Sequence, residues 1–305
     1  MRGATKAKHD PQRLGIAWWN TSLSPNAAVG RASASDYQNA IQVIESITGS
    51  GVSLFGLAEI SARDVDVVQV AGALPGFVVT EQDRPAGRSK FDTCIAFDPR
   101  KFSLLDKGDV VKTRGEKTLR IGQRFRFGVS GATNALHVLV SHWPSKMHSS
   151  GLPVGDAYAH HMREAVDAIL SDEPAAQILL MGDYNDEPHS PNMSYHLRST
   201  RDREFAVKRS GGLLYNPFWR HLSPRCPSTT RWPSHDHGTY HYAGEMTKWH
   251  TFDQMLFSRS MLDGKGDWRL DEGRVEIFID HSLKTLVQTA TIFDHLPIMA
   301  NLVRV

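Results

Sequence analysis

The sequence predicts an α/β fold in which two packed β-sheets are flanked by helices. Two observations predict it: short apolar runs of strand length recur along the chain, and two segments with helical periodicity lie between them. Clear helical crossovers are few relative to the strands, which fits two packed sheets better than one doubly wound parallel sheet. A chain of 305 residues can bury a full hydrophobic core without disulfide or metal staples.

Seven apolar runs are predicted to be strands, because each is short and is bounded by polar or turn-forming residues. Several of them end beside a side chain that could take part in catalysis or metal binding. The predicted strands are Leu14–Trp19, Val52–Leu57, Thr93–Phe97, Leu136–Val140, Ile178–Met181, Met255–Phe257 and Ile298–Val303.

Two helices are predicted between these strands. Over Asp36–Ile47 apolar residues recur every three or four positions and a glycine follows, and Ala157–Leu170 shows the same spacing before a proline. Residues 186–250 have little periodicity, and we expect a functional or partly helical loop there. No linker-like stretch divides the chain, so a polar tail at residues 1–13 and one domain over residues 14–305 are expected.

The composition excludes several classes of protein. The formal net charge is +2, from 35 Lys+Arg and 33 Asp+Glu, which argues against a histone-like or polybasic protein. Two cysteines, Cys94 and Cys226, cannot form a disulfide framework and suit a reducing compartment or a fold that needs no disulfide bridges. No secretory signal or long apolar stretch is seen, so we expect a cytoplasmic protein with no membrane partner.

Polar residues of chemically useful types stand at the ends or starts of the apolar runs. Strand ends on one edge of a sheet converge in space, so these side chains are expected to form one site. Carboxylate and amide oxygens suit Mg²⁺, Mn²⁺ or Ca²⁺, and carboxylate-supported histidines suit proton transfer. The set therefore favours metal-assisted hydrolysis of a phosphoester. Its members are Asn20, Glu59, Asp92, His142, Asp183, Asn185, Asp253, Asp294 and His295.

The order of these motifs resembles the endonuclease/exonuclease/phosphatase superfamily, which includes deoxyribonuclease I-like and exonuclease III-like enzymes. The segment Met181–Pro188 (MGDYNDEP) is similar to the family's GDFN(D/E)EP, and Asp294–Pro297 (DHLP) is similar to its SDHxP. The segment Ser141–Ser145 (SHWPS) resembles the NHWPS of a bacterial branch. The same branch has counterparts of Gly238–Tyr242 and Phe252–Gln254. The resemblance spans nearly the whole chain.

The resemblance implies a four-layer α/β sandwich, deoxyribonuclease I-like, with the site at one edge of the two sheets. It implies that Asn20, Glu59 and Asp294 hold a divalent metal ion, Mg²⁺ or Mn²⁺, with Ca²⁺ also allowed. One departure is Phe293, which stands where the family usually has a serine. That change removes a local hydroxyl but no metal ligand.

The resemblance also implies catalytic roles. Asp183 would orient or deprotonate the attacking water, and Asn185 would bind the phosphate. His295, paired with Asp253, would act as general base or stabilise the transition state. All the catalytic residue types are present, which favours an active enzyme.

His142, held by Asp92, is implied to contact the phosphate or the leaving oxygen.

For the substrate we expect nucleic acid, DNA rather than RNA. Between Arg84 and Arg126 there are 12 Lys/Arg against 5 Asp/Glu, which suits a phosphate backbone but also a solvated basic face. The segment Trp219–Trp249 interleaves aromatic and cationic residues, which suits base stacking but also the anchoring of a long loop.

Two other functions are kept as alternatives. One is a phosphatase or phosphodiesterase that acts on a small phosphorylated molecule or a lipid headgroup, although the inositol 5-phosphatase motifs are missing here. The other is a non-catalytic nucleic-acid-binding module, which the complete set of catalytic residue types disfavours. The four histidines between residues 235 and 250 match no standard zinc spacing.

Overall fold

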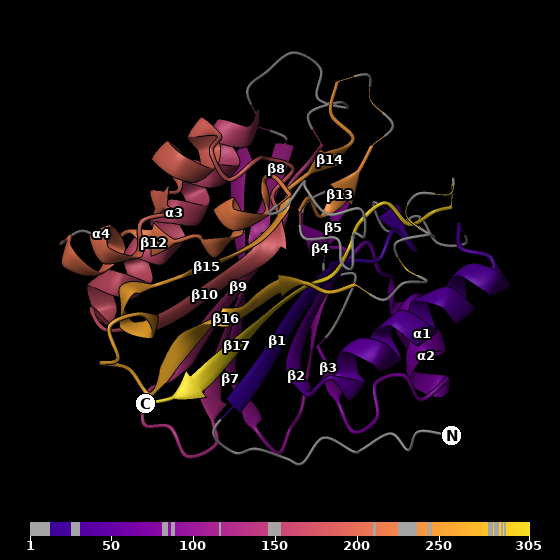
Figure 1. The fold of residues 1–305 in the computed structure, drawn as a ribbon, viewed down its shortest axis with the longest axis horizontal. Coiled ribbons are helices and arrows are strands. Elements are labelled where there is room, and N and C mark those ends of the chain that lie inside the picture. Colours follow the sequence, from indigo (N-terminus) through magenta and orange to yellow (C-terminus); the bar gives the residue numbers. More distant parts are fainter. Residues whose placement is uncertain are drawn as a thin grey trace.

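The computed structural model describes residues 13–25, 31–80, 85–86, 89–115, 117–145, 154–209, 212–224, 237–242, 244, 246–279, 283, 287, 289 and 291–305. Nearly all of the predicted tail, parts of the basic stretch and residues 225–236 of the aromatic segment lie outside these ranges. Two mixed β-sheets pack face to face, and helices cover their outer faces (Figure 1). The predicted four-layer α/β sandwich is thereby confirmed.

The first sheet has its two parallel strands at the centre. Helix α1 (Ala34–Gly49) connects β1 to β2 and makes this pair parallel, whereas the other pairs are antiparallel. Helices α1 and α2 (Ala62–Val70) lie together on the side of this sheet away from the second sheet (Figure 1). In spatial order the strands are β16 (Trp268–Ile277), β17 (Ile298–Arg304), β1 (Arg13–Asn20), β2 (Val52–Ala58), β6 (Thr93–Phe97) and β3 (Val78–Val79).

The second sheet also has a parallel pair joined by a helix near its centre, and its strands β11 and β12 form a second parallel pair at one edge. Helix α3 (Val154–Asp172) connects β9 to β10, which are parallel, and covers the outer face of the sheet. A long hairpin forms the far edge. In spatial order the strands are β11 (Ser199–Thr200), β12 (Leu214–Tyr215), β15 (Asp253–Phe257), β10 (Gln177–Asp183), β9 (Leu136–His142), β8 (Lys117–Val129) and β7 (Phe102–Arg114).

Short elements fill the connections. Two small antiparallel ribbons stand apart from the main sheets. The remaining elements are β4 (Pro85–Ala86), β5 (Ser89–Lys90), β13 (Tyr240–His241), β14 (Trp249–His250), α4 (Arg203–Lys208), the π-helix η3 (Asn192–His196), and the 3₁₀ helices η4 (Pro217–His221) and η5 (Arg259–Met261).

The core explains the continuous apolar runs of the sequence. Strands β1, β2, β6 and β10 are buried along almost their full length, because each is covered on both faces. Between the sheets lie large side chains that include Trp18, Phe127 and Met181. A second cluster, with Met162 and Val166, packs α3 onto the other sheet.

The elements predicted from periodicity are confirmed. All seven strands form within two residues of the predicted bounds, and both helices extend two or three residues beyond theirs. The stretch 186–250 is partly helical, as expected, with α4, η3 and η4. In the part of the chain that the structure describes, none of the helices is long and apolar enough to cross a membrane.

Candidate active site

The strand directions bring all nine predicted residues to one edge of the two sheets. The parallel pairs β1–β2 and β9–β10 end at this edge, whereas the antiparallel β6, β15 and β17 begin there. Strand ends therefore carry five of the nine residues, and strand starts carry the other four. The ends carry Asn20, Glu59, His142, Asp183 and Asn185, and the starts carry Asp92, Asp253, Asp294 and His295.

His142 is held by a buried carboxylate. Its Nδ1 lies 2.9 Å from Oδ2 of Asp92, and its Nε2 lies 3.6 Å from Oε1 of Glu59. Burial disfavours the imidazolium, but the carboxylates of Asp92, Glu59 and Asp183 outweigh it and raise the pKa of His142 to about 10. The raised pKa favours the imidazolium, in which Nδ1–H donates to Asp92 and Nε2–H faces the site.

His295 forms a second pair of the same kind. Its Nδ1 lies 2.7 Å from Oδ2 of Asp253, and both side chains are buried. Burial again disfavours the charged ring, and the carboxylates of Asp253 and Asp183 raise the pKa of His295 well above its ordinary value. Two carboxylate–histidine pairs thus present their Nε2 atoms at this sheet edge.

Asp183 lies between the two histidines. Its Oδ2 is 3.6 Å from Nε2 of His295 and 3.9 Å from Nε2 of His142. The two Nε2 atoms are therefore within about 7.5 Å of each other by the triangle inequality, close enough to reach one phosphate group. Burial raises the pKa of Asp183, only partly offset by the histidines, which makes this carboxylate a better proton acceptor.

Oxygen-rich side chains surround the same point. The Asn20 amide donates to Oε1 of Glu59 at 3.3 Å and to Oδ2 of Asp183 at 3.2 Å. Ser22 donates its hydroxyl to Oδ1 of Asp294 at 2.7 Å, and that oxygen lies 3.9 Å from Nε2 of His295. Burial raises the pKa of Glu59, with a further contribution from Asp294.

The backbone is strained at this edge. Four non-glycine residues among those described have a positive φ, and three of them belong to the site: Ser22 (54°), Glu59 (49°) and Asn185 (49°). Such conformations cost free energy and persist where surrounding contacts hold them, commonly at functional sites. A contact of this kind holds Asn185, whose side-chain Nδ2 donates to the backbone carbonyl of Trp143 at 2.8 Å.

In the motif around Asp183, some residues face the candidate site and others hold the backbone of the motif in place. A Cβ at position 182 would lie 2.3 Å from the carbonyl oxygen of Ser141 on the adjacent parallel strand, so only glycine fits there. Asp186 is buried and accepts from the amide of Asn192 at 2.7 Å. Glu187 accepts from the Thr251 amide at 3.1 Å, which ties the motif to the strand β15 region.

Sequence reasoning missed three neighbours of the site. The indole of Trp18 donates to Asp253, the hydroxyl of Ser22 to Asp294, and the ring of Tyr240 lies 4.7 Å from that of His295. Two of them had a local signal: Ser22 lies two residues after Asn20, and Tyr240 lies in the Gly238–Tyr242 motif. All three contacts join parts of the chain that are far apart in the sequence.

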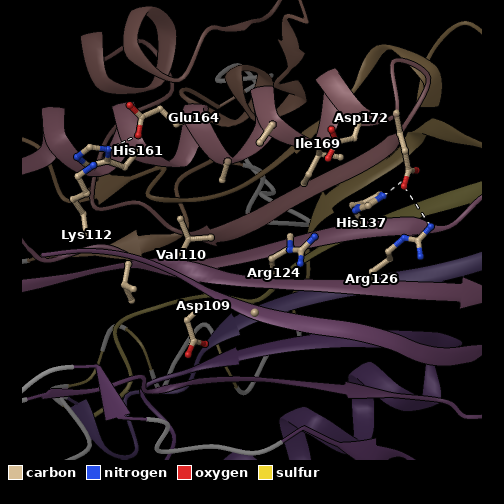
Figure 2. A pocket seen from close by; sticks show the side chains of 15 residues that line it. Asp109, Val110, Lys112, Arg124, Arg126, His137, His161, Glu164, Ile169 and Asp172 are labelled. Atoms are coloured by element: carbon tan, nitrogen blue, oxygen red, sulfur yellow. Dashed lines mark hydrogen bonds and ion pairs between the residues drawn. The ribbon is translucent and has the colours of Figure 1, made fainter.

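A separate cleft of about 520 Å³ lies on the outer face of the second sheet, between α3 and the β7–β8 hairpin (Figure 2). It is lined by Arg124 and Arg126, which pair with Asp106 and Glu173 respectively. These two arginines of the predicted basic stretch therefore do not face the candidate site. None of the nine predicted residues lines this cleft.

The chain matches a known family in sequence and several solved structures in fold. A model of the endonuclease/exonuclease/phosphatase family matches residues 30–291. No curated protein sequence matches the chain at a significant level. The catalytic domain of human Nocturnin, solved with bound sulfate, is 14% identical with a TM-score of 0.62, over 97% of this chain and 95% of that domain.

Two further solved structures share the fold. ANGEL2, a 2',3'-cyclic phosphatase in complex with adenosine-2',3'-vanadate, is 14% identical with a TM-score of 0.64, over 95% of both chains. The mannosyl-6-phosphatase of Bacteroides thetaiotaomicron is 15% identical with a TM-score of 0.58, over 95% of this chain and 99% of that one. The match of the family model over most of the chain, together with this fold, leads to one conclusion: the chain belongs to the endonuclease/exonuclease/phosphatase family of phosphoester hydrolases.

Proposed function

We propose that the protein is a divalent-metal-dependent phosphodiesterase that hydrolyses nucleic acid, DNA in preference to RNA. The observation that carries the proposal is the position of Asp183, whose carboxylate lies between the Nε2 atoms of His142 and His295. One carboxylate that can take a proton and two imidazoles that can contact phosphate oxygens suit attack of water on a phosphoester.

The site has the donors that a divalent cation needs. Five carboxylates and the Asn20 amide converge on two imidazoles, so the cluster carries net negative charge even with both rings protonated. Hard oxygen ligands of this kind suit Mg²⁺ or Mn²⁺. We assign the ion to Asn20, Glu59 and Asp294, where it would stabilise the negative charge that develops on the phosphate. We do not assign Asp253 to the metal ion, because its two carboxylate oxygens accept hydrogen bonds from the Trp18 indole and the His295 ring.

In this proposal, side chains of the protein carry out proton transfer and bind the phosphate. Asp183 orients the water and accepts its proton, helped by a raised pKa. His142, protonated at Nε2, donates to a phosphate or leaving oxygen, while Asp92 holds the other ring nitrogen. His295 stabilises the pentacoordinate phosphorus of the transition state, and Asn185 binds a phosphate oxygen.

A nucleic-acid substrate is supported by the aromatic surface beside His295. Tyr240 stacks on Phe252 at 5.2 Å, and Phe252 stacks on His250 at 4.9 Å, with all three partly exposed. Partly exposed rings next to a phosphoesterase site can stack on bases. Although burial opposes it, His142 lowers the pKa of Asp92, and Arg120, from the predicted basic stretch, lies close enough to add a smaller contribution. The resemblance to deoxyribonuclease I-like and exonuclease III-like enzymes favours DNA.

The test is a substrate panel of supercoiled plasmid, single-stranded DNA, RNA and small phosphomonoesters, each with Mg²⁺ or with EDTA. We expect plasmid nicking that EDTA, Asp183→Asn and His295→Ala each abolish. The exposed His160 on α3 gives a matched control, and His160→Ala should keep full activity. Phosphate release from small phosphomonoesters alone would show that the alternative, a small-molecule phosphatase, is correct.

The metal assignment has its own test. Glu59→Gln should weaken binding of Mn²⁺ measured by calorimetry, because it removes one charged oxygen ligand. Unchanged affinity in Glu59→Gln would exclude Glu59 from the metal site, whatever the substrate.

A further inference from the structure

The buried indole of Trp18 contacts the carboxylate that holds His295. Nε1 of Trp18 donates to Oδ1 of Asp253 at 2.9 Å, and the other oxygen of Asp253 accepts from Nδ1 of His295 at 2.7 Å. Trp18 and Asp253 are completely buried. The indole, the carboxylate and the imidazole therefore form one continuous chain of hydrogen bonds, of which the indole and the carboxylate are shielded from bulk water.

The indole has little freedom to move. It lies against Gly56 on the neighbouring strand β2, where a Cβ would be 2.7 Å from Cε3 of Trp18 and 2.8 Å from Cε of Met181. Only a glycine leaves room for a ring of this size between the sheets. Close packing against Gly56, together with full burial, thus fixes the direction in which the indole N–H points.

Among the described residues, the Asp253 carboxylate accepts hydrogen bonds from the Trp18 indole and the His295 ring alone. The two hydrogen bonds given above satisfy one oxygen each, and a buried carboxylate oxygen without a donor is costly. If the indole N–H were removed, Asp253 would rotate or draw in another donor, and the imidazole that it holds would tilt with it. Orientation of a catalytic histidine depends on the partner of its other ring nitrogen.

From this geometry we propose that Trp18 is a positioning residue, which fixes the Asp253 carboxylate and through it the orientation of His295. For its effect on catalysis this inference rests on the proposed function. The contact itself does not, and it can be tested without turnover.

The first test compares two buried tryptophans. Trp18→Phe removes the indole N–H that reaches Asp253, and Trp268→Phe removes one that has no hydrogen-bond partner among the described residues. With bis(p-nitrophenyl) phosphate and Mn²⁺, we expect kcat to fall about tenfold to a hundredfold in Trp18→Phe with KM unchanged. Trp268→Phe should keep the wild-type kcat. Equal losses in the two variants would overturn the proposal.

A double-mutant cycle separates positioning from general loss of structure. If Trp18 acts through Asp253, Trp18→Phe should cost nothing further in an Asp253→Ala background. Losses that multiply would mean that Trp18 acts elsewhere. If Trp18→Phe does not fold, benzothienylalanine at position 18 keeps the bicyclic shape without the N–H, and the same results are expected.

An NMR measurement tests the contact independently of activity. The proton on Nδ1 of His295 should give a far-downfield resonance, assigned by its loss in His295→Ala. Removal of the Trp18 N–H should shift this resonance, whereas Trp268→Phe should not. An unshifted resonance overturns the positioning role even in an active enzyme. A shifted resonance in a protein that hydrolyses no phosphoester leaves the positioning intact and refutes the proposed function alone.

Discussion

Gly182 offers the sharpest test of how the site is built. Strands β9 and β10 are parallel, and Gly182 is paired with Ser141 one residue before His142 and Asp183. A Cβ at position 182 would lie 2.3 Å from the Ser141 carbonyl oxygen, about 1 Å closer than an ordinary C···O contact of about 3.3 Å. Since the obstacle is backbone in the middle of a sheet, a side-chain rotation cannot relieve it.

Gly182→Ala should therefore destabilise the fold and displace the site together. We expect the free energy of unfolding to fall by about 3 kcal/mol, the upper end for forced overpacking, in urea titrations followed by tryptophan fluorescence. Activity should fall further than the folded fraction does, because the strands that carry His142 and Asp183 must separate. The control is Gly49→Ala at the end of α1, where a Cβ meets nothing within 4 Å. It should change stability by at most about 1 kcal/mol. A Gly182→Ala variant as stable as Gly49→Ala would refute the close approach of the two strands.

Three further predictions concern stability. Burial lowers the pKa of His137 below its ordinary value, so the folded state binds fewer protons than the unfolded chain. The free energy of unfolding should therefore decline as pH falls through about 6.5. Urea titrations at several pH values should show a weaker pH dependence in His137→Gln, and an unchanged dependence would contradict the role of His137. Ser61 forms a capping box with Asp64 at the start of α2, so Ser61→Ala should cost about 1 kcal/mol in thermal unfolding, and a neutral result would show that the cap contributes nothing. Phe293 stacks on Trp19 with ring centroids 5.9 Å apart and is buried, so Phe293→Ser, which restores the family's usual residue, should lose about 3 kcal/mol or more in urea; a gain in stability would show that the ring is not needed for packing.

The sequence predicted the central elements well, for a simple reason. Strands covered on both faces read as continuous apolar runs, as β2 and β10 do, and helices with one buried face show a period of three to four residues, as α1 does. These signals are local, so they can be recognised in the sequence without knowing which elements pack against each strand or helix.

Other elements lacked such a signal. The hairpin of β7 and β8 has 13 residues in each strand, yet charged residues such as Lys107 and Arg124 interrupt its apolar pattern. One face of the hairpin lies along the cleft in Figure 2, where Arg124 forms an ion pair with Asp106 instead of an apolar contact. Helix α2 is too short, at nine residues, for periodicity to be read from it.

The candidate site could be predicted as a set of residues but not as an arrangement. Useful side chains at strand ends indicated one edge of a sheet, and the structure brings all nine to that edge. Their roles in metal binding and catalysis stay predictions. Asp92 had the weakest local signal, and its contact with His142 at 2.9 Å appears only in the folded chain.

By itself, the sequence determined the alternation of strands and helices, the residue types of the site and their resemblance to a known family, because these depend on neighbours in the chain. Only the tertiary structure decided that Asp183 lies between two histidines and that Trp18 donates to Asp253 across 235 positions. The physical reason is that hydrogen bonds and pKa values depend on distance and burial in space, which packing of two sheets sets and no local pattern records.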